Sequence, residues 1–299
     1  MTQEEKIAIA ETVRHRDRFG PVSQEELAAL SGKETELWIQ TKNGYCVHVF
    51  EERPEALPDR APILLNFHGG GFLKGRTDRE RRYCCAVMEA TNALVWDVDY
   101  SLAPEKPFPY AAEESYGIIQ YVFEHAEELC IDPEKIMLAG HSAGGNLVAS
   151  ALVKNAETKA FHPCCALMEY FPTDNTANPV ERLSEELKQD PFWVKRAETE
   201  KLYTDFYVGD ADASDPCCSP AFATEQVLAA FPDCLILSAG KDSLRDDTEN
   251  FGMRLVKAGV CVTMQRIPEA MHGFTTNRTP GWERALELHD RFFLEHINR

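Results

Sequence analysis

The segment Ile136-Met-Leu-Ala-Gly-His-Ser-Ala-Gly-Gly145 decides the fold of this 299-residue chain. Its first four residues are apolar and predict a buried strand, and the stretch from Gly144 to Asn155 predicts a helix. Between them stands Gly140-His-Ser142-Ala-Gly144, a G-x-S-x-G motif at a strand-to-helix turn. Such a sharp turn leaves no room for side chains two residues before and after the serine. The pattern predicts a nucleophile elbow, which lifts the Ser142 hydroxyl above a sheet.

Apolar strands and amphipathic helices alternate on both sides of this segment. Lys42-Asn43-Gly44 predicts an antiparallel hairpin between residues 36–41 and 45–50. Six further strands are expected as continuous apolar runs, at 63–67, 93–96, 136–139, 165–168, 235–238 and 260–264. The helices expected around them cover 79–92, 111–129, 144–155, 243–257 and 282–296. This alternation predicts an α/β fold with about eight strands, mostly parallel and covered by helices on both faces.

The segment from Phe171 to Asp210 is far longer than an ordinary connection between two strands. It is rich in aromatic and charged residues, and its pattern is helical from about Val180 to Leu202. We expect an inserted lid here, and the alternative is an extra helix packed on the side of the sheet. The first ~30 residues are also expected to be helical.

The charge balance restricts the partners. The chain has 49 Asp and Glu against 31 Lys and Arg, a net charge of −18. This excess of acid argues against nucleic acids and anionic membranes, and it favours a neutral or cationic substrate, although a local basic pocket stays compatible with it. No apolar run approaches the about 20 residues of a membrane span, and no signal peptide is visible. We therefore expect a cytoplasmic protein. The sequence leaves the oligomeric state open, and a homodimer is one of the alternatives.

The ten cysteines contain no C-x-x-C pair, so the spacings of zinc, iron–sulfur and thioredoxin sites are missing. In a reducing cytosol, cysteines of this kind are mostly buried small hydrophobes. These cysteines therefore predict no metal site, and a serine nucleophile needs neither a metal nor a cofactor.

His68-Gly-Gly-Gly-Phe72 directly follows the expected strand 63–67. Three successive glycines cost backbone entropy and so need a reason. A flexible loop is one interpretation. The other is an oxyanion hole, because loops of this HGGG type bring backbone N–H groups close to a reacting oxygen and accompany the nucleophile elbow. His68 is interpreted as the hydrogen-bonded anchor of this loop.

A serine nucleophile needs a general base, which in turn is oriented by a carboxylate. Enzymes with this elbow order the three groups as Ser, then acid, then His. His272 is the expected base, because it lies in a loop just past the strand 260–264. Asp242 is the expected acid, because it follows the strand 235–238.

Other residues of the same types fit less well. Asp246 and Asp247 are expected in the first turn of the next helix, where acidic side chains favour the helix dipole. His162 precedes any strand that could carry the acid, and His289 and His296 belong to the C-terminal helix. His141 stands next to Ser142, but adjacent side chains in a tight turn diverge, so it is interpreted as a packing residue of the elbow.

These motifs together resemble the hormone-sensitive lipase branch of the α/β-hydrolases, with bacterial short-chain esterases as the nearest shape. The resemblance covers residues 63–274. Besides the glycine loop and the elbow, Asp97–Pro109 is similar to the family's Y-R-L-A-P-E-x-x-F-P segment. Lys241–Asp246 is similar to its D-P-L-R-D acid motif. Three positions depart from the pattern: His141 replaces Asp, Ser101 replaces Arg and Ser243 replaces Pro.

The resemblance implies a triad of Ser142, Asp242 and His272. It also implies that the oxyanion is bound by the backbone N–H groups of Gly70, Gly71 and Ala143. The supporting positions of the two motifs are His68, Gly69, Gly140 and Gly144. One catalytic domain over residues 1–299 would carry a cap formed by about 1–35 and 171–210.

The expected activity is that of a serine carboxylesterase acting on small neutral short-chain esters, acetyl esters included, through an acyl-enzyme and without a cofactor. Two alternatives remain at this point. One is a catalytically silent α/β-hydrolase that binds a small molecule, and the other is a serine peptidase or amidase.

Overall fold

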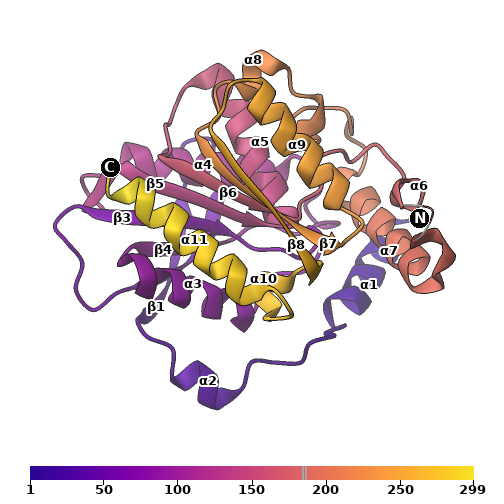
Figure 1. The fold of residues 1–299 in the computed structure, drawn as a ribbon, viewed down its shortest axis with the longest axis horizontal. Helices are drawn as coiled ribbons and strands as arrows, with labels where there is room; N and C mark the ends of the chain where they lie inside the picture. Colours follow the sequence, from indigo (N-terminus) through magenta and orange to yellow (C-terminus); the bar gives the residue numbers. More distant parts are fainter. Residues whose placement is uncertain (184, 186) are drawn as a thin grey trace.

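A computed structural model describes residues 1–183, 185 and 187–299, and an eight-stranded sheet forms its centre (Figure 1). The strand order is β1-β2-β4-β3-β5-β6-β7-β8. The strands are β1 (Lys33–Gln40), β2 (Cys46–Arg53), β3 (Ala61–Phe67), β4 (Leu94–Asp99), β5 (Ile131–His141), β6 (Cys165–Glu169), β7 (Asp233–Lys241) and β8 (Val262–Met271). The pairs β1–β2 and β2–β4 are antiparallel, and every other neighbouring pair is parallel. The predicted α/β architecture is confirmed.

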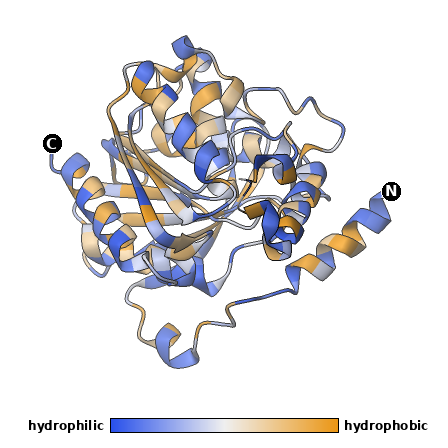
Figure 2. Ribbon diagram, turned by 45° about the vertical axis from the view of Figure 1, so that its right-hand side comes forward, coloured by the Kyte–Doolittle hydropathy of each residue, from blue (hydrophilic) through white to orange (hydrophobic). Residues whose placement is uncertain are grey.

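Helices cover both faces of this sheet (Figure 1). Residues of α4 (Tyr110–Glu124), α5 (Ala143–Thr158) and α9 (Arg245–Lys257) belong to one apolar core cluster, and residues of α3 (Asp78–Thr91) and α11 (Trp282–Ile297) to another. Two shorter helices, α8 (Glu225–Leu228) and α10 (Phe274–Asn277), stand in connections. Figure 2 shows apolar strands inside and helices with hydrophilic outer turns. This arrangement explains the continuous apolar runs, because the central strands are buried on both faces.

The expected helix 111–129 is too long, because α4 ends at Glu124. The chain continues through turns to Cys130, which adopts a left-handed φ of 57° just before β5. Helical periodicity alone does not mark such an end, since apolar residues of the turns continue the spacing.

The segment from about Val180 to Leu202, whose pattern is helical, does not form one continuous helix. The described residues form α6 (Pro179–Arg182), a 3₁₀ turn (Leu187–Gln189) and α7 (Pro191–Val208), while positions 184 and 186 lie outside the described residues. The break before Pro191 has a physical cause, since proline has no N–H and clashes with the preceding turn. Asp190 caps the new helix by accepting the Phe192 N–H at 2.9 Å.

The first 30 residues form two helices, α1 (Gln3–Arg14) and α2 (Gln24–Ala28), separated by the non-helical residues 15–23. Figure 2 shows α1 at the side of the molecule. Arg14 attaches it there by donating to the carbonyl of Leu73 at 2.8 Å and pairing with Glu105 at 2.6 Å. The intervening segment thereby comes to lie beside the carboxyl ends of the central strands.

All ten cysteines are free thiols. Five are buried and two are partly buried, whereas Cys46, Cys130 and Cys261 are exposed, so burial as small hydrophobes holds for half of them. None of the helices in the described part of the chain has the length and apolar character needed to cross a bilayer.

Candidate active site

The predicted site residues come together because their strands end at one edge of the sheet. Phe67 of β3 pairs in register with Gly140 of β5, so the glycine loop lies beside the elbow. Further along the strand order, at the same carboxyl edge, Lys241 of β7 pairs with Met271 of β8. The next residues along these two strands are Asp242 and His272. Parallel strand order therefore converts four separate sequence motifs into one site.

The elbow has the strained backbone that its motif predicts. Ser142 adopts φ 53° and ψ −117°, outside the ordinary range of a residue with a side chain. A Cβ on Gly144 would overlap the Phe67 carbonyl oxygen, and a Cβ on Gly140 would overlap Gly144 itself. The Ser142 N–H donates to the Glu169 carbonyl at 3.0 Å, which fixes the turn to the neighbouring strand β6. Strain of this kind persists because the surroundings hold it.

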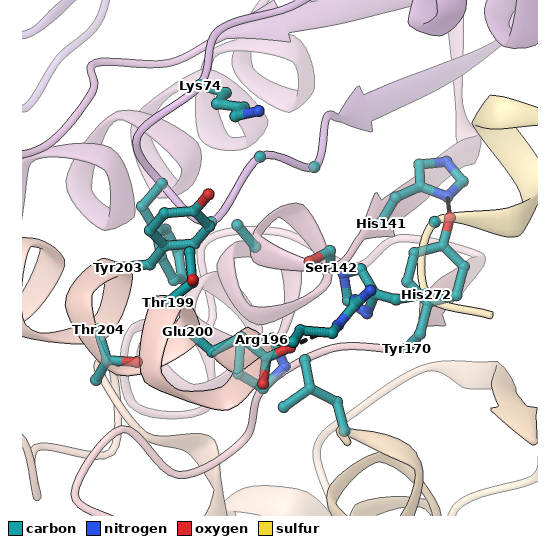
Figure 3. A pocket seen from close by; sticks show the side chains of 18 of the residues that line it. Lys74, His141, Ser142, Tyr170, Arg196, Thr199, Glu200, Tyr203, Thr204 and His272 are labelled. Carbon is teal, nitrogen blue, oxygen red and sulfur yellow. Dashed lines mark hydrogen bonds and ion pairs between the residues drawn. The ribbon is translucent and has the colours of Figure 1, made fainter. Parts of the chain in front are cut away.

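Ser142, His272 and Asp242 form a continuous hydrogen-bonded relay (Figure 3). The distance from Ser142 Oγ to His272 Nε2 is 2.8 Å, and that from His272 Nδ1 to Asp242 Oδ2 is also 2.8 Å. An ionised carboxylate only accepts, so His272 donates from Nδ1 and its Nε2 is left to accept the serine proton. Burial raises the pKa of Asp242, but the charge and hydrogen bond of His272, the charge of Arg196 and the Leu244 N–H together lower it more, so the carboxyl pKa lies below its usual value.

The glycine loop presents unused backbone donors to this relay. Gly70 and Gly71 have φ of 133° and 61°, which residues with side chains rarely adopt. No hydrogen bond within the described residues uses either N–H. Ala143 begins α5, where the first backbone N–H groups have no partner inside the helix. A Cβ on Gly71 would overlap the ring of Tyr203 in α7, so this loop is closely packed on its outer side.

His68 holds the base of the loop rather than facing the serine. Its side chain is fully buried and stacks on Tyr100 with ring centroids 4.2 Å apart, and Tyr100 donates to the His68 carbonyl at 2.8 Å. Burial lowers the pKa of His68, but the Asp99 carboxylate, 3.6 Å from Nε2, raises it together with the charges of Asp97 and Glu80 and the Gly69 carbonyl, and the net shift is upward. Gly69 packs beneath the elbow, since a Cβ there would lie 3.2 Å from the His141 carbonyl.

A buried ionic cluster beneath the elbow escaped the sequence analysis. Glu169 ends β6 and accepts from His141 Nδ1 at 2.7 Å, from His289 Nε2 at 2.9 Å and from Thr275 Oγ1 at 3.1 Å. Burial raises the pKa of Glu169, but His289 and His141 lower it more, to about 2. A usable signal was present, namely a carboxylate placed at the end of an otherwise apolar strand, where this fold collects its polar groups.

The alternative acidic residues lie elsewhere. Asp246 and Asp247 occupy the first turn of α9, as predicted. Asp247 forms an ion pair with Arg182 at 2.6 Å, and burial raises its pKa to about 6. Neither residue contacts His272. Within the described residues, no group of three or more His, Cys, Asp or Glu side chains is arranged to hold a metal ion.

A cavity of about 400 Å³ opens above the relay. Its floor contains Ser142 and His272 (Figure 3) and the glycine loop. Its walls come from residues 16–19 and from α7. Aromatic wall residues include Phe19, Phe192 and Tyr203. The site therefore combines a hydroxyl, an oriented imidazole and free N–H groups around one cavity.

Comparison with known proteins assigns the family. A protein-family model described as the alpha/beta hydrolase fold matches residues 64–276 of the sequence. Esterase LipI of Mycobacterium tuberculosis is 32% identical over 223 residues, covering 74% of this chain and 68% of that protein. The ethyl acetate hydrolase of Pseudomonas putida is 30% identical over 265 residues, covering 84% and 80%. The crystal structure of carboxyl esterase 2 from the fungus Tuber melanosporum matches with a TM-score of 0.83 at 26% identity, covering 99% of this chain and 98% of that one. This chain therefore belongs to the α/β-hydrolase family, in the hormone-sensitive lipase branch that its motifs resemble.

Proposed function

We propose that this chain is a serine carboxylesterase that hydrolyses short-chain acyl esters, acetyl esters included, through an acyl-enzyme. One observation carries the proposal, namely the relay Ser142–His272–Asp242 at the floor of a cavity. The named relatives are esterases and ester hydrolases, and they support an ester hydrolase.

In the first half-reaction, Ser142 Oγ attacks the acyl carbon while His272 Nε2 takes the hydroxyl proton. Asp242 keeps the imidazole in the required tautomer and stabilises the imidazolium that forms. The negative charge on the tetrahedral oxygen is stabilised by the N–H groups of Gly70, Gly71 and Ala143. His272 then returns its proton to the leaving alcohol, and the acyl group stays on Ser142.

In the second half-reaction, water replaces the alcohol and the same groups act again. His272 takes a proton from the water, the resulting hydroxide attacks the acyl carbon, and the same N–H groups stabilise the second tetrahedral oxygen. Proton return to Ser142 Oγ releases the carboxylic acid. Every transferred proton thus passes through one imidazole nitrogen, Nε2 of His272.

The proposed cap consists of residues 1–35 and 171–210. Support comes from the cavity walls, where Phe19 represents the first segment and Phe192 and Tyr203 represent the second. A volume of about 400 Å³ with aromatic walls suits a small acyl group. In a series of 4-nitrophenyl esters, turnover should be highest for the short acyl chains, and a maximum at long chains would contradict this part of the proposal.

The decisive variant is Ser142→Ala, assayed with 4-nitrophenyl butyrate. Removing the nucleophile of such a triad costs on the order of 10⁶ in kcat, so activity should fall to the background rate. Ser214→Ala, an exposed serine outside the cavity, is the matched control and should hydrolyse the ester like the wild type. A fluorophosphonate should label the wild type and the control but not Ser142→Ala. Unchanged hydrolysis by Ser142→Ala would refute the assignment.

A further inference from the structure

The charge of the cavity differs from that of the whole chain. The sequence contains 49 Asp and Glu against 31 Lys and Arg, whereas the described residues that line the cavity include seven Lys or Arg and only four Asp or Glu. The net charge favoured a neutral or cationic substrate. The local excess of cations points the other way, because it creates a potential that attracts an anion into the site.

Arg196 is the cation best placed to use this potential. It lies on α7, its side chain is 15% exposed, and Figure 3 shows it reaching toward Ser142 and His272. Its Nε donates to Glu200 Oε1 at 3.0 Å. No hydrogen bond among the described residues uses its Nη1 or Nη2, and both atoms are accessible. One side of the guanidinium is thus anchored, and its two terminal nitrogens remain available to a ligand.

Glu200 is itself held by a hydrogen bond from Ser243. Ser243 Oγ lies 2.9 Å and 2.8 Å from the two Glu200 carboxylate oxygens, and it follows Asp242 directly in the chain. In the D-P-L-R-D motif that Lys241–Asp246 resembles, this position is Pro, which has no hydroxyl to offer. The departure from the family pattern therefore supplies the hydrogen bond that orients the Arg196–Glu200 pair.

Three further cations surround the outer part of the cavity. Arg16 and Arg18 are exposed and have no carboxylate partner among the described residues, and Lys74 Nζ donates only to the Arg16 carbonyl, at 2.6 Å. Burial lowers the pKa of Lys74, and the charges of Arg18, Arg79 and Arg16 lower it further against the opposing effect of Asp17. Like charges held this close repel each other, and a bound anion would relieve that repulsion.

We propose that the ester cleaved by this chain carries a carboxylate, in its acyl or its alcohol part, which Arg196 binds through Nη1 and Nη2. The inference rests on the proposed function, because the same cavity holds the reacting ester. A planar guanidinium matches the two oxygens of a carboxylate with parallel hydrogen bonds. Arg16, Arg18 and Lys74 attract the same group at longer range, and their contribution decreases with added salt.

The test compares each acid with its neutral amide. The pair monoethyl glutarate and ethyl glutaramate places the charge in the acyl part, and the pair acetoxyacetate and acetoxyacetamide places it in the alcohol part. In at least one pair, wild-type kcat/KM should favour the acid about tenfold or more, as hydrogen bonds between charged groups allow. Arg196→Gln should remove this preference, and Arg196→Lys should keep part of it because the charge remains without the fork.

Arg291→Gln is the matched control, since Arg291 is an exposed arginine of α11 outside the cavity. The ratio between acid and amide is the readout, because Arg196 also acts on Asp242 and its loss affects both substrates. Calorimetric binding of the same pairs to Ser142→Ala tests the charge preference without turnover, which separates it from the proposed chemistry. A ratio at or below one in both pairs, or an equal ratio in Arg196→Gln and Arg291→Gln, overturns the proposal.

Discussion

Two histidine–carboxylate pairs lie next to Ser142. They differ in whether the Nε2 atom of the histidine has a hydrogen-bond partner. His272 Nδ1 lies 2.8 Å from Asp242, and His141 Nδ1 lies 2.7 Å from Glu169. The His272 side chain is 19% exposed and its Nε2 bonds to the serine, whereas His141 is 1% exposed and its Nε2 has no hydrogen-bond partner among the described residues. Nearly equal contacts thus give one pair access to the reacting atoms and leave the other inside the protein.

The comparison shows that proximity in sequence is a poor guide to a catalytic role. His141 adjoins Ser142 in the chain but points beneath the elbow, and His272 is 130 residues away but meets the hydroxyl. Glu169 also accepts from His289, so its carboxylate is committed to two imidazoles. We infer that the first pair serves proton transfer and the second serves the stability of the turn.

The largest expected effect is a loss of ester hydrolysis when the His272–Asp242 pair is changed. Asp242→Asn should lower kcat by about 10⁴, because an amide no longer enforces the tautomer in which Nε2 accepts the serine proton. Ester hydrolysis and thermal unfolding are measured together, and the unfolding temperature should change little in comparison. Asp246→Asn, in the exposed first turn of α9, is the matched control. A loss of less than tenfold in Asp242→Asn would remove Asp242 from the proposed relay.

The next effect separates the pairs by stability. Glu169→Gln should lower the free energy of unfolding by about 3 kcal/mol, because it removes one partner from a buried ionic cluster. Urea unfolding measures the change, and Glu128→Gln, an exposed glutamate without a hydrogen-bond partner in the described chain, is the control. Equal unfolding midpoints for Glu169→Gln and Glu128→Gln would contradict a structural role of this cluster.

The smallest effect is the pH dependence of stability that Glu169 contributes. The pKa of Glu169 is about 2 in the folded chain, below its ordinary value of 4.5. A group with a depressed folded pKa stabilises the fold above its unfolded pKa, and this stabilisation is lost as the pH falls through the folded pKa. The difference in unfolding free energy between wild type and Glu169→Gln should therefore be full at pH 6 and smaller at pH 3. A difference that grows toward pH 3 would have the wrong sign.

The sequence was sufficient for the parts of the site that local rules determine. Ser142, Asp242 and His272 each follow a strand, and parallel strands end at a common edge, so their meeting was predictable from order alone. Glu169 belongs to the same edge and was accessible to the same reasoning. The break at Pro191 was also readable, because proline rarely continues a helix from its interior.

Arg196 illustrates what local rules do not reach. Its orientation depends on how the inserted α7 packs across the sheet edge and on a hydrogen bond from Ser243, 47 positions later in the chain, to Glu200. No periodicity or motif encodes such a contact between an insertion and a distant loop. The net charge of −18 favours a neutral or cationic substrate, the opposite of the carboxylate that we propose, because a sum over the whole chain conceals where the charges gather.

The contact between Tyr203 and Gly71 links the size of the cavity to the position of the oxyanion donors. The ring on α7 lies so close to the glycine loop that a single methyl group on Gly71 would displace it. An acyl or alcohol group large enough to move α7 would therefore also remove the outer support of the backbone amides beside the serine. Such a substrate would therefore react more slowly in the chemical step and also bind more weakly. Discrimination against large substrates would then appear in kcat as well as in KM.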